Sequence, residues 1–213
     1  TAANYSIAST LAVQNNYQYR CIAIGQCNTT TSAAAVLTVN TAPAITSQPA
    51  ASTICANPNT SFSVAATGTT LTYQWQISTN GCSTFSDLAN GAPYSGATSA
   101  TLTITGAATG LNNSSYRCII NGACPGTATT NCTLLTVNTP LAVTAQPANS
   151  TFCAGAAATF TVAVSGTTPT YQWQQSTNGG TSFTNIINGG IYSGATTAAV
   201  TLTGITAGMN NYQ

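Results

Sequence analysis

Short runs of alternating apolar and polar residues recur along the chain, and they predict β-strands because side chains two positions apart share one face of a strand. Turn-forming Gly and Asn residues separate these runs about every 8–12 positions, and no stretch keeps the 3.6-residue spacing of a helix. The predicted inward positions of residues 41–138 are Phe62, Val64, Ala66, Tyr73, Trp75, Ile77, Leu102, Ile104, Tyr116, Cys118, Ile120, Leu135 and Val137. This pattern is typical of an all-β sandwich of two packed sheets.

The same motifs return at a nearly fixed interval, which predicts a tandem repeat. Tyr73–Gln76 recurs 98 positions later as Tyr171–Gln174, and Tyr19–Cys21 recurs 97 positions later as Tyr116–Cys118. The repeat divides the chain into a C-terminal part of one repeat (1–40), a complete repeat (41–138) and an N-terminal part of the next (139–213). We expect either that the polypeptide continues in both directions, which we favour, or that the outer parts of neighbouring molecules complete each other.

Three residues of the complete repeat carry a resemblance to the immunoglobulin-like sandwich. Trp75 matches the buried tryptophan of strand C, and Tyr116, two positions before Cys118, matches the tyrosine corner of strand F. By the repeat, Trp173 and Tyr19 take the same core positions in the outer parts. The resemblance implies tandem immunoglobulin-like domains, with strands E–G in residues 1–40 and strands A–E in residues 139–213.

Two positions depart from that family. Val64 stands where strand B of an antibody domain carries its cysteine, so the usual bridge to Cys118 is not available. Asn112–Asn113 replaces the acidic residue that often precedes the tyrosine corner.

A longer segment, Tyr171–Thr203, resembles the immunoglobulin-like repeats of very large secreted surface proteins of gliding-type bacteria. That resemblance implies a repetitive extracellular adhesin or filament polypeptide, and it implies no catalytic residue.

Charged residues make up only 1% of the sequence: Asp87 is the single acid, Arg20 and Arg117 are the only bases, and there is no histidine. Acid–base catalysis and nucleophilic triads need titratable partners that this chain lacks, so we expect no enzyme and no cofactor. Histidine or carboxylate metal sites are excluded for the same reason. Two bases make no phosphate-binding patch, so nucleic acid is not an expected partner. No apolar run reaches the roughly 18 residues that membrane insertion needs.

Eight cysteines in so uncharged a chain favour an oxidising, extracellular setting. Three positions recur between repeats, whereas Cys82 and Cys132 have no counterpart; the recurring pairs are Cys55 with Cys153, Cys21 with Cys118, and Cys27 with Cys124. A zinc site is disfavoured because no Cys-x2-Cys motif occurs, and no histidine is present to activate a catalytic thiol.

The leading disulfide hypothesis joins Cys55 to Cys118 and lets Cys124 cross the next hairpin to Cys132. A Cys82–Cys132 pair specific to this repeat is the alternative, although the expected strand positions place these two residues far apart.

Polar side chains offer further candidates. Seven asparagines head Asn-x-Ser/Thr triplets and are glycosylation candidates: Asn4, Asn28, Asn59, Asn112, Asn113, Asn131 and Asn149. Outward threonines such as Thr103 suit a half-exposed strand, and we interpret them as a polar face rather than an ice- or sugar-binding surface. Arg117 is expected to point outward, with Asp87 as its only anionic partner.

The sequence is compatible with three functions. The first is a structural extracellular fibre or stalk of tandem domains, stiffened by linker prolines and associating with copies of itself. The second is a cell-surface adhesin that binds glycans or another surface through its loops. The third is a spacer in a multidomain secreted enzyme.

Overall fold

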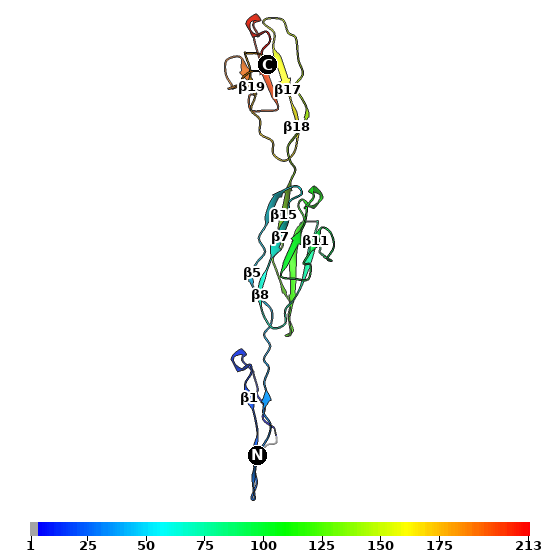
Figure 1. The fold of residues 1–213 in the computed structure, drawn as a ribbon, viewed down its shortest axis with the longest axis vertical. Helices are drawn as coiled ribbons and strands as arrows, with labels where there is room; N and C mark the ends of the chain where they lie inside the picture. Colours follow the sequence, from blue (N-terminus) through cyan, green and yellow to red (C-terminus); the bar gives the residue numbers. More distant parts are fainter. Residues whose placement is uncertain (1–3) are drawn as a thin grey trace. The chain divides into compact units, whose positions relative to one another are not determined.

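The computed structural model describes residues 4–213, which contain β-strands and short 3₁₀ turns but no α-helix. The chain falls into two compact units, Thr1–Val137 and Asn138–Gln213, which are described separately (Figure 1). No helix in the described part is long and apolar enough to cross a membrane.

The first sheet of residues 41–138 follows the order β10-β9-β13-β15-β6, and β14 also pairs with β13. Its strands are β6 (Ser52–Cys55), β9 (Thr72–Ser78), β10 (Ser86–Asp87), β13 (Ser115–Asn121), β14 (Ala128–Thr129) and β15 (Thr133–Asn138). β9 and β13 pair antiparallel, with Trp75 opposite Cys118. Residues directly opposite each other share a face, so both side chains enter the core.

The second sheet has the order β11-β12-β7, and a separate pair joins β5 to β8. Its elements are β5 (Ala44–Ser47), β7 (Thr60–Ser63), β8 (Ala65–Thr67), β11 (Tyr94–Ser95) and β12 (Thr101–Ile104), and the turn η2 (Thr109–Leu111) leads into β13. Gly96, in the turn between β11 and β12, has φ +75°, and a Cβ there would collide with the carbonyl oxygen of Thr101.

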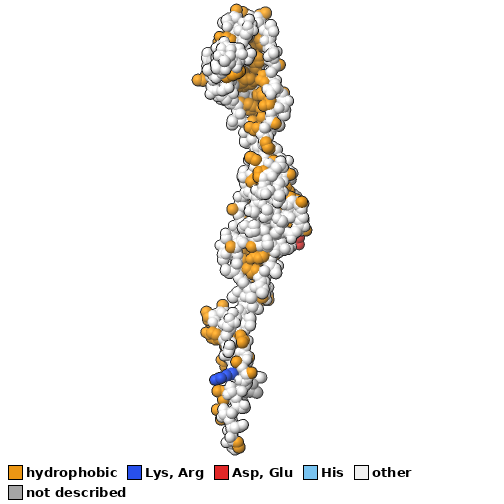
Figure 2. All heavy atoms as spheres, viewed as in Figure 1, with side chains coloured by type: hydrophobic (Ala, Val, Ile, Leu, Met, Phe, Trp, Pro, Cys, Tyr) orange, Lys and Arg blue, Asp and Glu red, His pale blue; other side chains and the backbone are white. Residues whose placement is uncertain are grey.

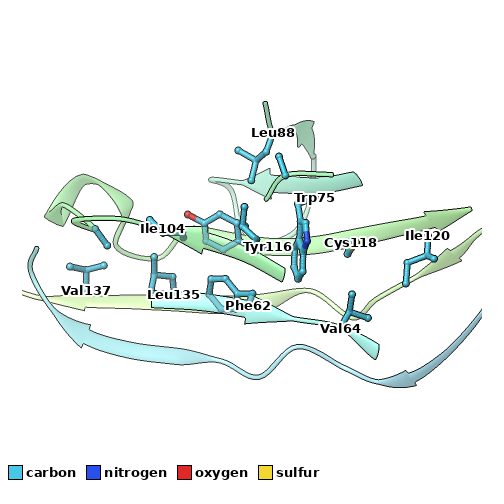
Figure 3. Close-up of a cluster of buried hydrophobic side chains, with 13 residues drawn as sticks. Phe62, Val64, Trp75, Leu88, Ile104, Tyr116, Cys118, Ile120, Leu135 and Val137 are labelled. Carbon is cyan, nitrogen blue, oxygen red and sulfur yellow. The ribbon is translucent and has the colours of Figure 1, made fainter. Parts of the chain in front are cut away.

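Aromatic side chains fill the space between the two sheets (Figure 3). The Phe62 ring stacks on Tyr116 with centroids 5.0 Å apart, and it lies 6.5 Å from Trp75. Nearly all the predicted inward positions are buried, and Ala66, Tyr73 and Ile77 are partly buried against them. The predicted all-β sandwich is therefore confirmed, because a period of two places every second side chain between the sheets.

Residues 4–40 hold one short 3₁₀ turn and a hairpin. The elements are η1 (Ala12–Gln14), β1 (Gln18–Tyr19), β2 (Ile22–Ile24), β3 (Thr29–Thr31) and β4 (Ala35–Val36). β1 pairs with β4, and β2 pairs with β3.

The C-terminal unit holds three separate sheets. β16 (Ala142–Ala145) pairs with β18 (Ala163–Ser165), and β19 (Gln174–Gln175) pairs with β20 (Thr184–Asn185). The third sheet has the order β17-β22-β21; its strands are β17 (Ala158–Thr161), β21 (Tyr192–Ser193) and β22 (Ala199–Leu202), and the turn η3 (Ala207–Met209) follows. The buried hydrophobic cluster of the C-terminal unit is small and comprises Ile186, Ala195 and Val200.

Candidate functional site

A disulfide joins Cys82 to Cys132, with Cα atoms 6.3 Å apart. The alternative pairing of the sequence analysis is therefore confirmed, and the predicted Cys124–Cys132 bridge is wrong. In the turn after β9, Cys82 has φ +69° and its N–H donates to Ser78 Oγ at 3.0 Å. The segment then crosses the outer face, where the Phe85 ring lies under Arg117 of β13. This path brings Cys82 close to β15, which strand order alone does not reveal.

The predicted bridge between Cys55 and Cys118 is not formed either, because both residues carry free thiols. Cys55 ends β6 and Cys118 lies in β13, and β15 separates these strands in one sheet. Adjacent strands are about 4.8 Å apart, so the two strands that carry these cysteines are at least roughly twice that distance apart, beyond disulfide reach.

The other free cysteines differ in exposure. Within the described residues, Cys21, Cys27, Cys55 and Cys153 are exposed and Cys124 is half-buried. Burial raises the pKa of the Cys118 thiol from 9.0 to about 11, despite a backbone hydrogen bond that acts the other way. A thiol with a raised pKa is a poor nucleophile, so Cys118 serves as core packing.

The only two charged side chains of residues 41–138 are linked through an amide. Arg117 Nε donates to Gln76 Oε1 at 2.7 Å, and Gln76 Nε2 donates to Asp87 Oδ1 at 2.6 Å. The Arg117 guanidinium also lies 3.7 Å from the centre of the Phe85 ring. Arg117 therefore lies on the outer face of the sheet, where it makes a cation–π contact with Phe85. Gln76 links it to Asp87, its predicted anionic partner.

Sequence reasoning missed an asparagine anchor at the start of β13. Asn112 Oδ1 accepts from Val137 N at 2.8 Å, and Asn113 N donates to the carbonyl of Leu135 at 3.0 Å. Residues 4–40 repeat the arrangement, because Asn15 Oδ1 accepts from Val39 N at 3.0 Å. The Asn-Asn pair recurs in all three parts of the sequence, and that recurrence was the available signal.

The predicted aromatic core residues separate into two groups. Trp75 and Tyr116 are fully buried, and the Tyr116 hydroxyl lies 3.3 Å from that of Tyr94. Burial, with a further contribution from the Tyr94 hydrogen bond, raises the Tyr116 pKa far above its ordinary value. Trp173 and Tyr19, their counterparts in the outer parts, are only half-buried.

All seven glycosylation candidates are exposed: Asn4, Asn28, Asn59, Asn112, Asn113, Asn131 and Asn149. Glycosylation itself stays a prediction.

The outer parts each leave an apolar face open. In the C-terminal unit a surface hollow is lined by Gln146, Pro147, Val162, Tyr171, Gln172 and Trp173. Figure 2 shows hydrophobic atoms gathered along this unit. A second hollow, in residues 4–40, is lined by Tyr5, Ile7, Tyr19, Ala35, Val36 and Leu37. These open faces are the candidate functional surfaces.

The described residues offer little for chemistry. No group of three or more His, Cys, Asp or Glu side chains among residues 4–213 is arranged to hold a metal ion. The arrangement is suited to packing, because apolar side chains line both surface hollows.

Solved structures with similar folds define the class of the protein as tandem immunoglobulin-like β-sandwiches. An I-band fragment of titin matches with a TM-score of 0.61 and 16% identity, covering 89% of this chain and 65% of the fragment. Sidekick-1 immunoglobulin domains 1–5 match at 0.56 and 17% identity, covering 92% and 42%. Extracellular domains 3–5 of Drosophila OTK match at 0.52 and 13% identity, covering 93% and 64%. The chain thus spans less than two thirds of each structure.

At these identities the likeness shows the fold alone. One family model, a domain of unknown function (DUF8696), matches residues 142–212. No curated protein matches the sequence.

Proposed function

We propose that the chain is a structural segment of an extracellular fibre or stalk built from tandem immunoglobulin-like domains, and that it is not an enzyme. Residues 1–40, 41–138 and 139–213 are then the end of one domain, a whole domain and the start of another. The repetitive surface polypeptides that Tyr171–Thr203 resembles would be its relatives.

The observation that carries the proposal is repetition of structural anchors without repetition of chemistry. The indole N–H of Trp75 donates to the carbonyl of Ser99 at 2.9 Å, and that of Trp173 donates to the carbonyl of Thr197 at 2.9 Å. Asp87 is replaced by Asn185, which accepts from Gln174 Nε2 at 2.8 Å. What recurs is hydrogen bonding that holds the sandwich, while the carboxylate of Asp87 does not recur.

Extracellular placement is supported by the Cys82–Cys132 disulfide, because such bonds persist in oxidising compartments. A chain in which 1% of the residues are charged repels other copies only weakly, which favours self-association. Glycans on the exposed asparagines would keep such a surface soluble.

Immunogold electron microscopy on intact cells of the source organism tests the proposal, using antibodies raised against the whole chain. We expect gold particles along surface fibres without permeabilisation. Labelling that appears only after permeabilisation would contradict an extracellular stalk. Glycan-array binding lost on loop substitution would favour an adhesin instead.

A further inference from the structure

Residues 41–138 carry a disulfide and a buried thiol on opposite faces of one sheet. We propose that the fold keeps the two apart, and that opening of the sandwich lets the Cys118 thiol attack the Cys82–Cys132 bond and form a Cys118–Cys132 bridge instead. The exchange turns a transient opening of the domain into a lasting extended state. It rests on the structural role proposed above only for its setting, a stalk that bears load.

The alternation of side chains along β13 and β15 places the two sulfur groups on different faces. Tyr116 lies opposite Thr133, and both side chains are buried between the sheets. Cys118 comes two positions after Tyr116, so it points to the same side, where it lies near Trp75 (Figure 3). Cys132 directly precedes Thr133 and therefore points to the outer face, where its disulfide lies. The sheet itself separates the thiol from the disulfide.

The folded core also keeps the thiol unreactive. The Cys118 side chain is fully buried, and burial raises its pKa to about 11, so that very little thiolate forms at neutral pH. Its N–H donates to Thr130 Oγ1 at 2.8 Å, and its carbonyl accepts from Thr130 N at 3.0 Å. Because the thiolate is the attacking species, exchange waits until the sandwich opens and the thiol regains its ordinary acidity.

Once the sandwich opens, the disulfide-closed loop keeps the thiol near the bond that it attacks. The disulfide joins residues with a sequence separation of 50, and Cys118 lies inside that loop, 14 positions before Cys132. A short flexible segment brings its ends together at a lower entropy cost than a long one, so the Cys132 sulfur is the favoured target.

The exchange needs no oxidant. The Cys118 thiol loses its proton to solvent, and its thiolate forms a bond to Cys132 Sγ. The Cys82–Cys132 bond breaks in the same step, and Cys82 leaves as a thiolate that takes up a proton. One disulfide and one thiol are present before and after.

The new bridge does not fit the folded sandwich. Cys118 belongs between the sheets, whereas Cys132 belongs on the outer face. A bond between them requires one of the two strands to present its opposite face, which takes Tyr116 or Leu135 out of the core. Refolding is therefore blocked until the bridge is shifted back or reduced.

The exchange also lengthens the opened chain. While the original disulfide is intact, the loop between Cys82 and Cys132 bears no tension. A Cys118–Cys132 bridge releases the 36 residue steps from Cys82 to Cys118. At roughly 3.6 Å per residue this is about 130 Å of extended chain. In a stalk, an opened repeat gains this length without a break in the chain.

Peptide mapping after transient unfolding tests the exchange. The unaltered chain is unfolded in urea at mildly alkaline pH without reductant, held for hours, diluted to refold and then alkylated. We expect a peptide pair joined through Cys118 and Cys132, and an alkylated Cys82. The folded chain, held equally long without urea, should keep the Cys82–Cys132 bond.

A second chain isolates the role of Cys118. In this background chain Trp173 is replaced by phenylalanine, and the other free cysteines are replaced by serine: Cys21, Cys27, Cys55, Cys124 and Cys153. After alkaline unfolding and dilution, its Trp75 fluorescence should stay that of the unfolded domain. Adding Cys118→Ala removes the attacking thiol, so the same treatment should restore the folded signal.

A change of pH provides a control that does not alter the core. Unfolding the background chain at acidic pH keeps the Cys118 thiol protonated, so the original disulfide should survive and dilution should restore the folded signal. In force spectroscopy of the background chain, an opened domain should lengthen by a further step of about 130 Å, which Cys118→Ala should abolish.

Three results overturn the proposal. The first is full recovery of the Cys82–Cys132 bond after alkaline unfolding. The second is exchange that runs equally fast in the folded chain. The third is a map of the unaltered chain in which Cys55 or Cys153 takes the bridge in place of Cys118. None of these results affects the cell-surface labelling, so the two proposals can fail separately.

Discussion

Removing the Cys82–Cys132 disulfide should destabilise residues 41–138 strongly. The bond closes a loop with a sequence separation of 50 residues. The chain-entropy relation for a loop of this length gives about 4 kcal/mol, and measured effects are commonly about 2–4 kcal/mol. With a urea m-value of about 2 kcal/mol/M for a domain of this size, the unfolding midpoint should fall by about 1–2 M.

The assay is urea unfolding of the full chain, followed by Trp75 fluorescence in a Trp173→Phe background. The variant is Cys82→Ser with Cys132→Ser, and the disulfide-bonded protein treated with reductant should match it. Cys55→Ser is the control, because Cys55 is exposed and carries a free thiol. A midpoint that is equal in the double variant and the unaltered chain would refute the pairing.

Three further outcomes are expected. Gly96→Ala should cost about 1–3 kcal/mol of stability and lower the melting temperature, because φ at Gly96 is +75° and the new Cβ would collide with the carbonyl oxygen of Thr101. Gly110→Ala is the control and should change the melting temperature little, because nothing lies within 4 Å of a Cβ there. The unfolding free energy should fall as pH rises from about 9 to about 11, because burial raises the Cys118 pKa and the thiol therefore ionises first in the unfolded chain. Urea titrations at several pH values measure this slope, and Cys118→Ala should flatten it. Asp87→Asn should change stability by less than about 0.5 kcal/mol in the same assay, because the relayed contact is exposed.

The sandwich and its core could be predicted because they depend on local alternation. Trp75, Leu102 and Tyr116 lie on strands whose every second side chain points inward. That alternation can be recognised in the sequence without knowing which distant residues are in contact. The repeat spacing supplied the counterparts in the outer parts.

The Cys82–Cys132 disulfide was predicted only as the alternative pairing, because its formation depends on the path of a turn. Strand order separates Cys82 from Cys132, and the conformation of the turn after β9, where Cys82 N donates to Ser78 Oγ, brings them together. Connectivity among many cysteines is not fixed by their spacing. A signal did exist, since these two alone lacked counterparts and so formed a natural pair.

The relay through Gln76 was missed for a different reason. The sequence pointed to Arg117 and Asp87 as partners, but a glutamine between them on β9 can bond to both at once. Long polar side chains on the outer face have many possible partners, and only the register of β9, β10 and β13 selects one.

Negative-stain electron microscopy of the purified, unaltered chain over a range of concentrations tests the central claim most directly. The account holds that these nearly uncharged sandwich repeats associate with copies of themselves to build a structural fibre. It predicts unbranched fibres whose length increases with concentration. Uniform particles of single-chain size at every concentration would contradict it.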